Sequence, residues 1–148
     1  MGLAGALLAT TAAAQVFIVD AANGPGTHYT DLPTAVAAAP DGSTLLVRRG
    51  RYTTFTLRGK GLKILGEGAG LAGGHVRIEA TAPGQLVLLR GFRWPDYHSV
   101  IVAQALGPVI FEQCTRGPQT HLFSASDLVI TASSNVQLHA CDLASQDG

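Results

Sequence analysis

Basic residues are concentrated in one part of this 148-residue chain, and they are its clearest candidates for binding chemistry. Nine of the ten lysines and arginines lie between Arg48 and Arg93, where only Glu67 and Glu79 oppose them. Arginine binds carboxylates through two parallel hydrogen bonds, and a basic surface attracts polyanions. The segment predicts either a site for acidic polysaccharide or an ordinary solvated face. The residues expected at such a site are Lys63, Arg77, Arg90 and Arg93, with Trp94 and Tyr97 either stacking on sugar rings or packing at the rim of the core.

Two pairs of reactive side chains recur at one spacing further along the chain. The interval from Glu112 to His139 equals the interval from Cys114 to Cys141. A carboxylate beside a histidine makes a general acid–base pair in a cleft, and an exposed ion pair elsewhere. Cysteines on adjacent strands form either a disulfide or a reduced stack of small apolar side chains. The shared spacing predicts two contacts between neighbouring repeats and leaves their chemistry open.

The composition of the chain excludes several classes of protein. The net charge is zero, which gives no case for a nucleic-acid partner. The two cysteines lack the spacing of a zinc site, and the aspartates are not clustered as a calcium site requires, so we predict no metal and no cofactor. Hydrophobic residues make up 47% of the chain and charged residues only 14%. This balance favours a repetitive β-structure over a helical bundle.

The first segment, residues 1–14, is apolar and ends in Ala12-Ala13-Ala14, the small-residue pattern of a secretory cleavage site. The segment is shorter than the roughly 20 apolar residues that cross a bilayer. It predicts a secreted or cell-surface protein without a membrane span. Residues 1–14 would be the signal peptide and residues 15–148 one domain. The alternative for the first segment is an ordinary buried helix.

Short apolar strands recur in two families. The first covers residues 62–65, 86–89, 109–112 and 136–139, and the second covers residues 76–78, 100–102 and 128–130. The last interval is the longest in both families, which indicates a single insertion around residues 115–125. A regular period of this kind predicts a solenoid, in which stacked repeats bury a shared core. Because successive side chains of a strand point to opposite faces, we expect Lys63 and Arg77 to point outward on neighbouring strands. The side chains predicted to lie inside are Leu62, Ile64, Leu86, Leu88, Val109, Phe111, Val136 and Leu138.

The order of elements near the N-terminus carries a family resemblance. Residues 16–24 read Val-Phe-Ile-Val-Asp-Ala-Ala-Asn-Gly, and residues 31–39 form a helical pattern with Thr30 or Asp31 as its N-cap. Next come a Pro40-Asp41-Gly42 break, a strand at Thr44–Val47, Gly50-Arg51-Tyr52 and the glycine-rich segment 59–68. This order resembles the entry into right-handed parallel β-helix proteins of the pectinesterase and pectate-lyase-like superfamily. The resemblance implies an all-β fold, with the short helix covering the N-terminal end of the β-helix.

The resemblance does not extend to the catalytic motifs of that superfamily. Thr54 replaces the glutamate of the Gly-x-Tyr-x-Glu motif, the Asp-Phe-Ile-Phe-Gly motif is absent, and only Gln146-Asp147 matches the Gln-Asp-Thr-Leu motif. We therefore expect none of the catalytic residues of that superfamily in this chain. One expected function is to bind or process extracellular polysaccharide, with any catalytic coils beyond Gly148. The alternative is a non-catalytic adhesion scaffold. The missing C-terminal cap predicts a truncated β-helix that self-associates through its open end.

Overall fold

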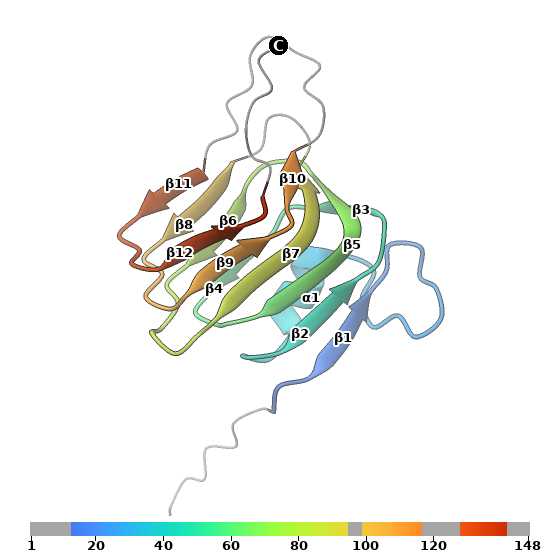
Figure 1. Cartoon of the computed structure of the whole chain (residues 1–148). Helices are drawn as coiled ribbons and strands as arrows, with labels where there is room; N and C mark the ends of the chain where they lie inside the picture. The colour runs from blue at the N-terminus through green and yellow to red at the C-terminus, as the bar shows by residue number, and fades with distance from the viewer. Residues whose placement is uncertain (1–12, 95–98, 117–127, 142–148) are drawn as a thin grey trace, which may run out of the picture.

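The structure is a computed structural model that describes residues 13–94, 99–116 and 128–141, and these form a parallel β-solenoid (Figure 1). The chain winds through about four turns, with one short helix near its start. In chain order the elements are β1 (Val16–Val19), α1 (Leu32–Ala38), β2 (Thr44–Val47), β3 (Arg51–Thr53), β4 (Thr56–Arg58), β5 (Lys63–Ala72), β6 (Val76–Glu79), β7 (Val87–Trp94), β8 (Val100–Ala103), β9 (Val109–Glu112), β10 (Thr115–Arg116), β11 (Leu128–Thr131) and β12 (Val136–His139).

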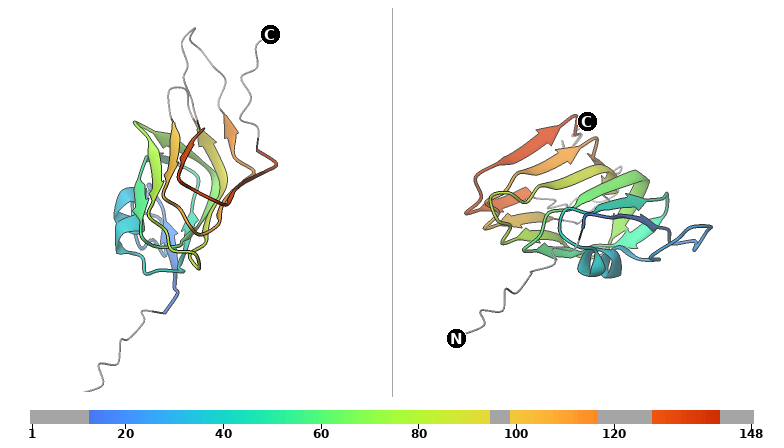
Figure 2. Two further views of the ribbon diagram at one scale, coloured as in Figure 1. Left: turned by 90° about the vertical axis from the view of Figure 1, so that its left-hand side faces the viewer. Right: turned by 90° about the horizontal axis from the view of Figure 1, so that it is seen from below.

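The strands of successive coils stack into two parallel sheets. The larger sheet has the order β1-β2-β5-β7-β9-β12, with β3 added to β5 and β10 added to β7. The smaller sheet has the order β4-β6-β8-β11. From β5 onward, paired strands of the larger sheet are separated in the chain by a strand of the smaller one, so the chain climbs one coil at a time (Figure 2). This arrangement confirms the predicted parallel β-helix.

The core is a set of aliphatic and aromatic columns between the two sheets. Ile64, Leu89 and Phe111 are registered neighbours in the larger sheet and are all buried. In the smaller sheet Val76, Val100 and Leu128 are registered neighbours, as the repeat predicted. Each fully buried aliphatic side chain contributes roughly 1.5–3 kcal/mol relative to an exposed one. No single coil can bury its apolar face alone, so the columns stabilise the stack as a whole.

The prediction for residues 86–89 was wrong by one position. Val87 and Leu89 are buried and Leu88 points outward, because Lys63 pairs with Leu88 and Ile64 with Leu89. The chain therefore takes a slightly longer path between β5 and β7 than the repeat suggested. All four residues of this segment are apolar, so alternation alone cannot choose the inner face.

The inward-facing side chains of the last described coil are uncovered. Leu138 follows the same column as Phe111 but is 49% exposed, and Val136 is half-buried. In the smaller sheet Ile130, which pairs with Val102, is 45% exposed. No other described strand lies beyond β11 or β12. The final coil is therefore held more by backbone hydrogen bonds than by burial.

Helix α1 packs against β1, β3 and β4 at the N-terminal end of the stack (Figure 2). Asp31 caps its first turn by accepting a hydrogen bond from the Thr34 N–H at 2.9 Å. At its other end the ammonium of Lys60 donates to the carbonyl oxygens of Val36, Ala37 and Ala39 at 2.8–2.9 Å. A cation at a helix C-terminus offsets the partial negative charge there. The predicted helix is thus confirmed and is fixed at both ends. No helix of the described residues is long and apolar enough to span a membrane.

Left-handed backbone residues mark a recurring corner of the coil. Ala80, Gln104 and Ala132 each follow a strand of the smaller sheet with φ near 50°, and Gly59 holds the equivalent place one coil earlier. Such a conformation costs an L-residue roughly 1–2 kcal/mol. The same conformation recurs at each corner because the chain must turn at the same place in every coil.

Candidate functional site

Five of the basic residues predicted to form a basic flank serve the fold. Arg48 pairs with Asp20 at 3.0 Å, and Lys60 caps α1 as described above. Arg58 and Arg77 both contact Glu79, at 2.5 and 3.6 Å. Arg90 pairs with Glu112 at 2.7 Å. Asp20 and Glu112 lie outside the basic segment, so the fold brings in carboxylates that the local sequence does not show.

The other four basic residues of this segment are exposed. They are Arg49, Arg51, Lys63 and Arg93. No described carboxylate lies within 4 Å of any of the four. Their charges are available to a ligand, whereas the paired arginines would have to give up a partner first.

Two of these free cations lie in one column along the solenoid axis. Arg51 of β3 pairs with Gly70 of β5, Gly70 pairs with Arg93 of β7, and Arg93 pairs with Thr115 of β10. We name Arg51, Gly70, Arg93 and Thr115 the arginine column. Gly70 itself has no side chain, and a Cβ atom placed there would meet only the Gly50 carbonyl oxygen, at 3.7 Å. Two ladder steps place the Cα atoms of Arg51 and Arg93 about 10 Å apart.

The structure separates the other residues predicted for the polysaccharide site. Lys63 belongs to β5 of the larger sheet and Arg77 to β6 of the smaller one, so they do not lie on neighbouring strands as expected. Arg90 is exposed but held by Glu112. Tyr97 lies outside the described residues. Of the predicted binding residues, only Arg93 belongs to the arginine column.

Trp94 is in the core rather than on the surface. Its residue exposure is 5%, and its ring lies 6.5 Å from the rings of both Phe92 and Phe111. Alternation along β7 explains the placement, because Arg93 points outward and Trp94 therefore points inward. The indole is not available to stack on a sugar ring, and core packing is the role that the structure gives it.

Glu112 and His139 are registered neighbours on β9 and β12, as their spacing predicted. Their side chains, however, have other partners. The Glu112 carboxylate accepts from Nε and Nη2 of Arg90 at 2.8 and 2.7 Å, and His139 Nε2 lies 3.0 Å from the Gln137 side-chain oxygen. The carboxylate is committed to a guanidinium, and His139 is exposed on the outer face, so the pair does not have the geometry of a general acid–base site.

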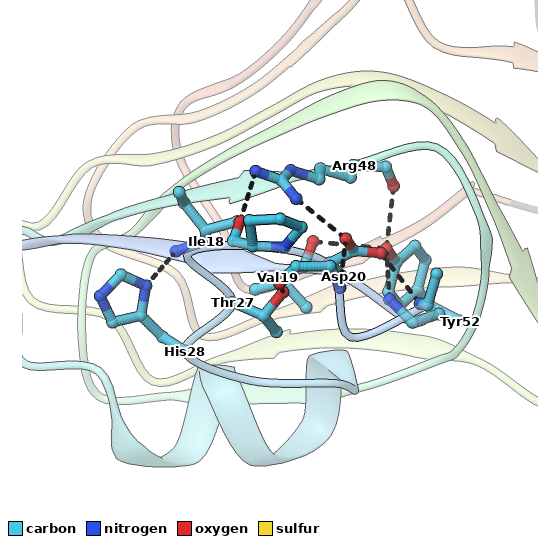
Figure 3. Close-up of polar contacts among 11 residues, drawn as sticks. Ile18, Val19, Asp20, Thr27, His28, Arg48 and Tyr52 are labelled. Carbon is cyan, nitrogen blue, oxygen red and sulfur yellow. Dashed lines mark hydrogen bonds and ion pairs between the residues drawn. The ribbon is translucent and has the colours of Figure 1, made fainter.

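A polar cluster that the sequence analysis missed centres on Asp20 (Figure 3). Its carboxylate accepts from the N–H groups of Ala22 and Gly24 at 2.9 and 3.1 Å, and from Arg48 Nη1 at 3.0 Å. The Tyr52 hydroxyl donates to the Arg48 carbonyl oxygen at 2.9 Å. Arg48 also donates to the carbonyl of Pro25 at 2.9 Å. The cluster fastens the loop between β1 and α1 to the first coils. The sequence signal that could have indicated this cluster is an aspartate, Asp20, shortly before an Asn-Gly-Pro-Gly turn.

Asp20 should make the stability of the fold sensitive to acid. The N–H of Ala22 and, to a smaller extent, the guanidinium of Arg48 lower the pKa of this carboxyl below its ordinary value of 3.8. A carboxyl with a lowered folded-state pKa stabilises the fold above its unfolded-state pKa, and this stabilisation is lost as the pH falls through the folded-state value. We expect Asp20→Asn to lower the melting temperature at neutral pH and to converge with the wild type in strong acid.

Thermal unfolding followed by circular dichroism across the acid range measures this effect. Asp31→Asn is the matched control, because asparagine caps a helix about as well as aspartate. A constant difference between Asp20→Asn and the wild type at every pH would contradict the role given to the charge.

These features define the class of the protein: a parallel β-solenoid with a helix at its N-terminal end and two unpaired arginines in line on one face of its described part. Within the described residues, no group of three or more histidine, cysteine, aspartate or glutamate side chains is placed to hold a metal ion. No family model matches the chain, and neither a curated protein nor a solved structure is significantly similar to it. The architecture and the exposed charges are therefore the basis for the function proposed next.

Proposed function

We propose that this solenoid binds acidic polysaccharide along the arginine column. The observation that carries the proposal is the placement of Arg51 and Arg93, both exposed and without a carboxylate partner among the described residues, on either side of Gly70. Guanidinium groups bind carboxylates through paired hydrogen bonds. Two of them in line along the solenoid axis suit a chain that carries acidic groups at regular intervals better than a single small anion.

Two further features support this proposal. The N-terminal order of elements resembles that of the pectate-lyase-like superfamily, whose members act on acidic polysaccharide. The leader-like residues 1–14 also agree with a role outside the cell. Gln15 is the residue that follows the predicted cleavage site. Its N–H donates to Ser43 Oγ at 3.1 Å, and its carbonyl accepts from the Thr44 N–H at 2.7 Å. Removal of residues 1–14 would turn the Gln15 nitrogen into an ammonium group, which can still donate to Ser43 Oγ, and would leave the carbonyl contact unchanged.

Replacing both arginines of the column should weaken binding. We expect Arg51→Gln/Arg93→Gln to bind polygalacturonate about tenfold more weakly than the wild type, which corresponds to roughly 1.4 kcal/mol for two exposed contacts. Isothermal titration at low and physiological salt measures the affinity. The wild-type affinity should fall as salt rises, because exposed charges are screened over about 8 Å at physiological ionic strength.

The matched control is Arg49→Gln/Lys63→Gln, which removes the same charge from exposed, unpaired positions outside the column. It should keep most of the affinity. Equal losses in the two double variants would mean that net charge, and not the column, binds the polymer. Failure of the wild type to bind polygalacturonate at low salt would overturn the proposed function itself.

A further inference from the structure

Cys114 and Cys141 occupy equivalent positions on adjacent coils. Strand β12 pairs in register with β9, and each cysteine lies two positions beyond the end of its strand. The residue before each has the same left-handed conformation, with φ of 51° at Gln113 and 49° at Ala140. The backbone therefore takes the same path into both cysteines. Cys114 is buried in the core. Cys141 is half-buried and packs against the edge of the same core.

The side chain of Cys141 reaches back toward the coil that carries Cys114. Its Sγ lies 3.3 Å from the carbonyl oxygen of Phe111 in that coil and 3.4 Å from the carbonyl oxygen of His139 in its own. Cys114 Sγ lies 3.4 Å from the carbonyl oxygen of Glu112. Both thiols are free in the structure. They donate weak hydrogen bonds that a covalent bond could replace.

The ladder spacing is compatible with a bond between the two sulfur atoms. Neighbouring strands lie about 4.8 Å apart, within the roughly 4.4–6.8 Å range of Cα separations that disulfides span. The Cβ atoms must approach to about 3.8 Å, somewhat closer than the ladder holds them. β12 pairs with β9 and with no other described strand, and its side chains are poorly buried. The coil of β12 can therefore shift by the small distance required.

We propose that Cys114 and Cys141 form a disulfide under oxidising conditions and that this bond fastens the coil of β12 onto the coil of β9. The proposal does not depend on polysaccharide binding, because neither cysteine belongs to the arginine column. It assigns a role to the pair of cysteines that the proposed function leaves unused.

The reaction proceeds by thiol–disulfide exchange with an oxidised small thiol such as glutathione disulfide. The thiolate of Cys141, the more exposed of the two, attacks one glutathione sulfur and expels the other glutathione as a thiolate. Cys114 then loses its proton and attacks Cys141 Sγ, which expels the second glutathione as a thiolate; each glutathione thiolate takes up one proton. The two protein thiols lose two electrons and two protons, and glutathione disulfide is reduced to two glutathione molecules. The second step is the slow one, because burial raises the pKa of Cys114 to about 12.

The experiment incubates the full chain with a glutathione redox mixture, then denatures it, alkylates the remaining thiols and maps the peptides. We expect a peptide that joins Cys114 to Cys141 within one chain. The melting temperature of the oxidised protein should be higher than that of the reduced protein by on the order of 5 °C. Amide hydrogen exchange in β12 should slow on oxidation, because this is the strand that the bond fastens.

Cys141→Ser is the control variant, since a hydroxyl can still donate to the Phe111 carbonyl but cannot form the bond. Its melting temperature should not depend on the redox mixture. The proposal is overturned if both cysteines of the monomer remain open to alkylation, if a mixed disulfide with glutathione persists at Cys141, or if cross-links form only between chains. A cross-link that leaves exchange in β12 unchanged would overturn the fastening role. None of these outcomes bears on binding by the arginine column.

Discussion

Gly107→Ala is expected to destabilise the solenoid by about 3 kcal/mol, a large effect for one methyl group. A Cβ atom at this buried position would meet the carbonyl oxygen of Ala82 at 2.6 Å and would lie closer still to that of Gln85. Both oxygens belong to the backbone of the preceding coil and cannot rotate away as a side chain can. The two coils would have to separate, which would strain the nearby ladder hydrogen bond from the Val87 N–H to the Pro108 carbonyl. Chemical denaturation followed by circular dichroism measures the loss.

Gly84→Ala is the matched control because it makes the same chemical change in the turn that Gly107 touches. A Cβ atom at Gly84 would meet nothing within 4 Å. Its methyl group should be neutral or should stabilise the protein by up to about 1 kcal/mol, since alanine restricts the unfolded chain. If the two variants lose the same stability, the close approach of the coils is not what requires glycine at position 107.

Phe92→Ala is expected to have the largest effect of any core substitution, about 3–5 kcal/mol. The ring is fully buried and lies beside Trp94, which in turn contacts Phe111. Removing it leaves a cavity at the corner where β7 turns from one face of the solenoid to the next. The loss should appear as a lower midpoint of denaturation. Trp94 fluorescence should also change, because the indole loses its neighbour.

Two variants test the cause of this loss. Phe92→Leu keeps much of the buried volume and should lose less than Phe92→Ala. Arg93→Ala changes the next residue of the same strand, where the side chain is exposed, and should stay within about 0.5 kcal/mol of the wild type. If Phe92→Ala loses no more stability than Arg93→Ala, the core does not depend on the ring.

The sequence was sufficient to predict the architecture where alternation is clear. Val76, Val100 and Leu128 are registered as predicted, because Arg77 marks the outer face of the first strand and the repeat spacing assigned the same register to the other two. The helix was equally predictable, because Asp31 is a typical N-cap residue and the first turn tolerates a proline such as Pro33. Residues 86–89 are apolar throughout, and here the prediction chose the wrong face. The local pattern contains no polar residue that marks the outer face. The pairing with β5 determines which side chains point inward.

The arginine column could not be predicted from repeat length. The interval from Arg51 to Gly70 is shorter than the interval from Gly70 to Arg93, although each spans one coil. The coil from β5 to β7 is the longer one along its whole length, and the register shift between Leu65 and Ala69 reduces the difference without removing it. The ion pairs could not be predicted from the sequence for a similar reason. Asp20 and Arg48 are far apart in the sequence, as are Arg90 and Glu112, so only the stacking of coils brings each pair together.

Stacked coils also limit how such a surface can diversify. The separation of Arg51 and Arg93 is a whole number of ladder steps, each about 4.8 Å. A point substitution can delete a charge but cannot move it by a fraction of a step. Gain or loss of one complete repeat, by contrast, lengthens or shortens the interval by one step while leaving every contact within a coil intact. Duplication of a short gene segment is therefore the event that would change the spacing of the two arginines in a lineage of such proteins.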